Sequence, residues 1–157
     1  MNSITYGEIS FDDMYSLIKK FILEDFKASY RIAIGADSQN FGYTKVPVTI
    51  GVHRFINDCG RGGIFFSEIR KVKKISSIRQ KLYYETNLSL EYALKLRENF
   101  EKDKIPQNIT VHVDAGYNGP TSQLIAEVIG LVNSCGFPCL IKPDSYMAST
   151  VANRLSK

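Results

Sequence analysis

The chain has 157 residues, enough for one domain with a substantial core, and we expect a single domain over residues 1–157 that includes a helical N-terminal extension over residues 1–30. Hydrophobic residues make up 44% and charged residues 23%, and no apolar run approaches the roughly 20 residues of a membrane span, so we expect no membrane partner. The net charge of +4 slightly favours a polyanionic partner such as nucleic acid. Because the first residues do not resemble a signal peptide, we expect a cytoplasmic protein.

The first half of the chain predicts one helix and three strands. Apolar residues recur at helical spacing over residues 10–28, as in an amphipathic helix that covers a sheet. Three strand-like stretches follow at 31–39, 45–56 and 62–73. Short loops that contain Asn and Gly separate these stretches, which favours antiparallel pairing.

The second half alternates helices and strands. Ser76 or Ser77 is a suitable N-cap for a long helix that stops before Pro106. A strand, a helix, a strand and a closing helix are then expected over residues 108–114, 121–134, 138–144 and 145–156. The chain after residue 30 therefore has the order βββαβαβα, an α/β pattern that leaves the spatial order of the strands open.

Two aspartates stand at the ends of predicted strands. Asp37 follows "RIAIGA" and Asp114 follows "ITVHV". Each alone is most simply explained as a turn former. If their strands are parallel neighbours, the two carboxylates emerge close together at one edge of the sheet, where they need a cation between them or a proton on one. The pair therefore indicates a possible cation site.

A hard divalent cation binds more oxygens than two carboxylates supply, so a third acid is expected from the long helix. Glu85 shares a helix face with Leu82 and other residues that are expected to contact the sheet. Glu91 has Lys95 four residues later, which is typical of a solvated face. Periodicity favours Glu85, and an ordinary surface glutamate is the alternative if the two aspartates lie apart.

The element order and these acids together resemble the ribonuclease H-like superfamily over residues 31–157. More narrowly, "IGADSQ", "YYET", "HVDAG" and "IKPDSYMASTVANR" are similar to motifs of the small bacterial YkuK-type proteins, and the last motif is the most specific. The resemblance implies a five-stranded mixed sheet in the order 3-2-1-4-5, flanked by helices. It also implies a two-metal nuclease site at one edge of that sheet.

By this resemblance Asp37 bridges two Mg²⁺ or Mn²⁺ ions, and Glu85 and Asp114 complete one metal shell. The closing helix supplies a fourth ligand, and the matching position is Asn153. An amide oxygen brings no charge, so the second metal is expected to bind weakly. Asp144 is either the missing carboxylate or a cap of the closing helix, and the cap is favoured.

Lys142 stands at a strand end and is a candidate substrate-binding residue, because its ammonium could meet a phosphate. His112 is more simply a core histidine. The basic run at 70–74 could follow a nucleic-acid backbone or only be solvated.

The sequence is compatible with three functions. The first is a metal-dependent nuclease or phosphodiesterase acting on DNA, RNA or a hybrid. The second is a nucleic-acid-binding module with a weakened site. A phosphotransferase of the actin and sugar-kinase type ranks last, since one domain cannot form the two-domain cleft of those enzymes.

Overall fold

The structure is a computed structural model that describes residues 1–3, 7–147 and 155. Its centre is a mixed sheet with the strand order β2-β1-β6-β5-β3-β7-β8, and β4 pairs with β5 outside this path. The strands are β1 (Asn2–Ser3), β2 (Gly7–Glu8), β3 (Ser29–Ala36), β4 (Gln39–Asn40), β5 (Thr44–Ile56), β6 (Cys59–Val72), β7 (Ile109–His112) and β8 (Cys139–Leu140).

The expected fold class is confirmed. The five predicted strands correspond to β3, β5, β6, β7 and β8, and their order across the sheet, β6-β5-β3-β7-β8, is the expected 3-2-1-4-5. The sheet is wider than expected, because β1 pairs with the free edge of β6, β2 pairs with β1, and β4 forms a short hairpin with β5. These additional strands are only two residues long, which is too short to leave an alternating pattern in the sequence.

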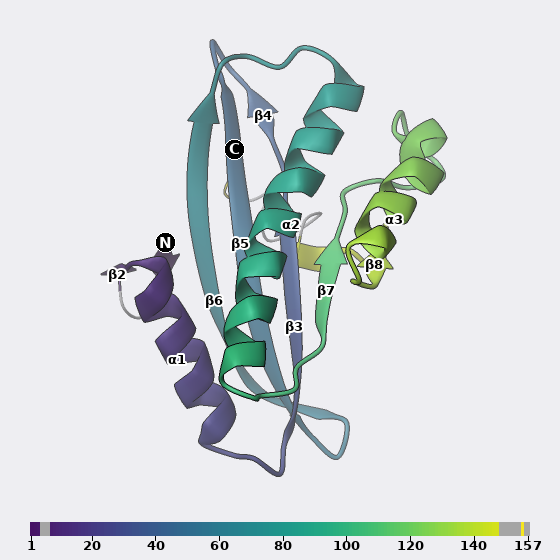
Figure 1. Cartoon of the computed structure of the whole chain (residues 1–157). Helices are drawn as coiled ribbons and strands as arrows, with labels where there is room; N and C mark the ends of the chain where they lie inside the picture. Colours follow the sequence, from purple (N-terminus) through teal and green to yellow (C-terminus); the bar gives the residue numbers. More distant parts are fainter. Residues whose placement is uncertain (4–6, 148–154, 156–157) are drawn as a thin grey trace.

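Helices α1 (Phe11–Leu23) and α2 (Ile78–Lys102) lie on the same face of the sheet (Figure 1), and α3 (Ile125–Ser134) lies beside β7 and β8. Alternate residues of β5 are fully buried on the helix-covered face, namely Val46, Val48, Ile50 and Val52. Burial of this apolar row beneath the helices contributes to the hydrophobic stabilisation of the layer. No described helix carries an apolar stretch that could cross a lipid bilayer.

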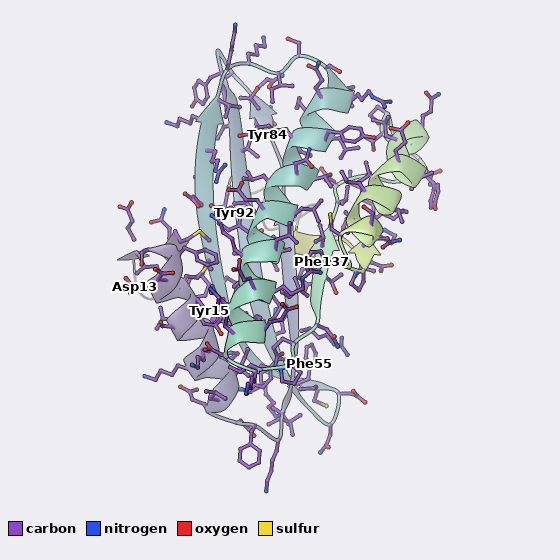
Figure 2. The ribbon with its side chains drawn as sticks, viewed as in Figure 1. Asp13, Tyr15, Phe55, Tyr84, Tyr92 and Phe137 are labelled. Atoms are coloured by element: carbon purple, nitrogen blue, oxygen red, sulfur yellow. The ribbon has the colours of Figure 1, made fainter. Side chains whose placement is uncertain are left out.

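Tyr15 makes one of the contacts that hold helix α1 against the C-terminal end of α2. Tyr15 points from α1 toward α2 (Figure 2) and packs edge-on against Phe100, with ring centroids 5.4 Å apart. Its hydroxyl donates to Asp103 Oδ2 at 2.6 Å. The helix ends at Leu23, earlier than the expected residue 28, because the Asp25 side chain accepts from the backbone N–H of Lys27 and forms a turn instead.

Helix α2 begins as its sequence predicts. Ser77, rather than Ser76, is the N-cap, and its hydroxyl accepts from the backbone N–H of Gln80 at 3.3 Å. The cap fixes the first turn of α2 at the end of the sheet where β3 and β7 finish. This position determines where the side chains of the second and third turns meet the sheet.

The chain after β8 crosses to the face that α1 and α2 leave uncovered. The Met147 N–H donates to His112 Nδ1 at 3.1 Å, and the Thr49 hydroxyl donates to the Met147 carbonyl at 3.1 Å. Gly51 of β5 lies beneath this residue, and a Cβ there would lie 2.4 Å from Met147 Cε. Most of the predicted closing helix, including Asn153, lies outside the described residues.

Candidate functional site

Asp37 and Asp114 lie at the same level on neighbouring strands. β3 and β7 pair in parallel, with Gly35 opposite His112, and each aspartate follows two residues later. Asp37 is only 8% exposed, and its N–H donates to the Pro47 carbonyl of β5 at 3.3 Å. The parallel adjacency on which the predicted cation site depends is therefore present.

Glu85 brings a third carboxylate to this edge from α2. Its side chain is 8% exposed, and Oε1 accepts a hydrogen bond of 2.5 Å from the Ser38 hydroxyl. Burial raises the pKa of Glu85 to about 8, and the negative charges of Asp37 and Asp114 raise it further, against the lowering effects of the Ser38 hydrogen bond and Lys81. Both aspartates are therefore near enough to Glu85 to disfavour its charged form.

Lys142 supplies a positive charge to the same cluster. Its Nζ lies 3.0 Å from Asp114 Oδ1, and about half of the lysine side chain is exposed. The two segments approach closely at Gly116, where a Cβ would lie 3.2 Å from Lys142 Cβ and crowd it. Lys142 was expected to meet a phosphate, and in this state it pairs with a carboxylate.

A cavity of about 510 Å³ adjoins Asp114 on the side of β8. Lys142 and Pro143 form one wall of this cavity, and the loop at 116–121 forms the other. Tyr117 in that loop is 71% exposed. Of the three carboxylates, Asp114 lines this cavity, while Asp37 and Glu85 are buried.

The donor set suits a hard divalent cation, because carboxylate oxygens are the ligands that Mg²⁺ and Mn²⁺ prefer. Among the described residues, however, no three His, Cys, Asp or Glu side chains converge as a ready-made metal-binding group. Two other features reduce the negative charge of these carboxylates. Glu85 favours its protonated form, and Lys142 partly neutralises Asp114.

The structure also shows the positions of Glu91, His112 and Asp144. Glu91 lies on the solvated side of α2 and pairs with Arg70 at 3.4 Å and Lys95 at 3.7 Å, as its spacing indicated. His112 is a buried, hydrogen-bonded residue, and burial lowers its pKa to about 4. Asp144 is exposed in the turn after β8.

Sequence reasoning missed Ser38. A serine after an aspartate at a strand end has the composition of an ordinary turn, so the sequence held no signal that its hydroxyl would contact a residue 47 positions later. It also did not anticipate that Lys142 would contact Asp114.

Comparison with known proteins agrees with this architecture. A family model described as ribonuclease H-like matches residues 13–157. The protein named "Uncharacterized protein YkuK" from Bacillus subtilis (strain 168) is 32% identical over 168 aligned positions, which cover 99% of this chain and 95% of that protein. No solved structure matches significantly. The chain therefore belongs to the ribonuclease H-like family, among its YkuK-like members.

Proposed function

We propose that the protein is a divalent-metal-dependent nuclease or related phosphodiesterase that acts on nucleic acid through Asp37, Glu85 and Asp114. The proposal is carried by the burial of Glu85 beside two other carboxylates at the ends of adjacent parallel strands. Burying one charge near two like charges destabilises a fold, and apolar residues would stabilise the same edge better. A cation bound there would offset the repulsion between these carboxylates.

Asp37, Glu85 and Asp114 are the proposed metal ligands, and the amide of Asn153 is the proposed fourth, weaker ligand. Bound Mg²⁺ or Mn²⁺ would polarise the phosphate, activate a water and stabilise the leaving oxygen. Ser38 orients the Glu85 carboxyl through its hydrogen bond. When a cation binds, Glu85 must release its proton, because only the carboxylate is a good ligand.

Lys142 is the proposed substrate-binding residue. It pairs with Asp114 in this state, and its half-exposed side chain borders the cavity beside that aspartate. If a cation were held by Asp114, the Lys142 ammonium would be free to contact a phosphate in the adjoining cavity. Lys142 thus binds either the protein's own carboxylate or the substrate.

The test is Mn²⁺-dependent cleavage of single-stranded, duplex, hybrid and branched nucleic acids. Wild type is expected to cleave at least one of these, and Asp37→Asn and Glu85→Gln are each expected to lower the rate by about 100-fold or more. Glu91→Gln is the matched control, since it removes a carboxylate from the solvated side of the same helix. Equal rates for Asp37→Asn and Glu91→Gln would contradict the proposal.

A second candidate is a nucleic-acid-binding module with weak or no catalysis. The observation that favours it is the Asp114–Lys142 ion pair, which neutralises part of the cluster with a residue of the chain itself. This candidate predicts nucleic-acid binding without cleavage of any substrate in the panel, in wild type as in Asp37→Asn.

A further inference from the structure

Two aromatic side chains stand on the hairpin that follows Asp37. Phe41 is 46% exposed and Tyr43 is 37% exposed. Their ring centroids lie 5.6 Å apart, and the Phe41 N–H donates to the Tyr43 carbonyl at 2.7 Å, which closes the turn. Exposed neighbouring rings on a tight turn offer flat surfaces on which a planar group can stack.

Lysines adjoin these rings on β5 and β6. Lys71 Nζ lies 5.5 Å from the centre of the Tyr43 ring, and Lys71 pairs directly opposite Lys45. Lys73 and Lys74 continue the exposed basic run beyond β6. β5 contains no acidic residue, and the one acid of β6, Glu68, lies opposite Val48 on the helix-covered face.

The lysines lie on the same face of the sheet as Asp37. The Asp37 N–H bonds to Pro47, and Lys45 lies two residues before Pro47, so alternation along β5 places Lys45 on the face that Pro47 shares. Lys71 lies on β6, one strand further from Asp37 than Lys45 does. From the spacings of a regular sheet, its backbone lies roughly 12 Å from that of Asp37.

The hairpin is fixed to the segment that leads into α2. The Thr44 hydroxyl donates to Asn40 Oδ1 at 2.6 Å and accepts from the Ile75 N–H at 2.8 Å, while Asn40 Nδ2 donates to the Ile75 carbonyl at 2.9 Å. Thr44 is fully buried. Because α2 carries Glu85, this network connects the aromatic turn to the helix that supplies one of the carboxylates.

We infer that Phe41, Tyr43, Lys45, Lys71 and Lys73 form a binding surface for single-stranded nucleic acid, here called the hairpin surface. Unpaired bases stack on Phe41 and Tyr43, and the lysines contact the backbone phosphates. A duplex is excluded as the preferred ligand, because its base faces are already covered by stacking. That the bound strand leads to Asp37 for cleavage rests on the proposed function, whereas the binding itself requires no metal.

The experiment is fluorescence anisotropy in EDTA with labelled oligothymidylate and oligouridylate of roughly 12 nucleotides and with a duplex of equal length. Wild type is expected to bind both single strands more tightly than the duplex. Phe41→Ala/Lys71→Ala is expected to weaken single-strand binding about tenfold or more. Lys71→Ala alone is expected to make the slope of log affinity against log salt shallower by about 0.7.

The matched control is Phe26→Ala/Lys27→Ala, which removes one exposed ring and one exposed lysine from the α1–β3 connection, at the end of the sheet opposite β4 (Figure 1). Its affinity should equal that of wild type. Phe41→Trp should also keep wild-type affinity, since it preserves a stacking surface. A preference for duplex, or equal weakening by both double variants, would overturn the inference.

The outcome also separates this inference from the proposed function. If wild type binds single strands through the hairpin surface but cleaves nothing with Mn²⁺, the inference stands and the nuclease proposal falls. If wild type cleaves with Mn²⁺ while Phe41→Ala/Lys71→Ala binds single strands like the control, the nuclease proposal stands and the hairpin surface falls.

Discussion

At the scale of single residues, the chemistry of the site concentrates on Glu85. Its carboxyl lies in the buried second turn of α2, where water cannot solvate a charge well, and it accepts a hydrogen bond from Ser38. Burial, together with Asp37 and Asp114, raises its pKa to about 8. The surroundings of Glu85 therefore favour its protonated form at the place where the proposed function needs a carboxylate ligand.

This pKa shift predicts a pH dependence of stability in the absence of metal. Between the ordinary value of 4.5 and about 8, the folded state binds more protons at Glu85 than the unfolded state does, so the free energy of unfolding falls as the pH rises through that window. Each unit of pKa difference corresponds to about 1.4 kcal/mol. Urea denaturation in EDTA from pH 5 to pH 8 should show a steeper loss for wild type than for Glu85→Gln.

Glu91→Gln is the control for this measurement, because it removes an exposed helical carboxylate and should keep the wild-type pH dependence. Parallel pH profiles for wild type and Glu85→Gln would show that Glu85 is ionised alike in both states.

At the scale of elements, hydrogen bonds join the β4–β5 hairpin to the segment just before α2. Thr44, at the first position of β5, bonds both to Asn40 and to the backbone of Ile75 just before α2. The Ile75 N–H donates its hydrogen bond to the Thr44 hydroxyl. The hydroxyl thus connects the hairpin to the helix that carries Glu85.

Thr44→Val should lower the free energy of unfolding by about 1–3 kcal/mol, because it keeps the shape of the side chain but leaves the Ile75 N–H and the Asn40 amide without the hydroxyl. Chemical denaturation measures this loss. Thr110→Val, at a half-buried position of β7, is the matched control and should cost less. Equal losses would mean that the Thr44 hydroxyl does not hold the junction.

At the scale of the whole molecule, the fold gathers residues 37, 85, 114 and 142 at one edge of the sheet. β3 and β7 place the two aspartates side by side, α2 places Glu85 against them, and the turn after β8 brings Lys142 to Asp114. Without the assembled sheet, none of these groups would interact. Metal binding should therefore be linked to global folding.

Mn²⁺ is expected to raise the melting temperature. A ligand at about 100 times its dissociation constant adds about 2.7 kcal/mol, and for a protein of this size that corresponds to a rise of roughly 5–10 °C. Asp37→Asn should abolish the rise and should be at least as stable as wild type in EDTA, since it relieves repulsion at Glu85. Thermal scans with and without Mn²⁺ measure both effects, and an equal rise in the two proteins would place the metal elsewhere.

The sequence by itself determined the elements and their faces. Helical periodicity favoured Glu85 over Glu91 as the residue facing the sheet, and Ser77, one of the two candidate N-caps, begins α2 in the structure. These are local properties, since the period of two residues in a strand and of 3.6 residues in a helix can be recognised from neighbouring residues alone. The order of the five main strands came from the resemblance to a family, because periodicity alone left it open.

Only the tertiary structure decided which groups meet. Ser38 bonds to Glu85 across 47 positions, Thr49 to Met147 across 98, and Lys142 reaches Asp114 through the turn after β8. Such contacts depend on register and on loop geometry, and neither leaves a pattern in the residues that finally touch. The carboxylate cluster could be anticipated because strand ends meet at an edge, whereas the proton, the hydroxyl and the ammonium that balance its charge required the folded chain.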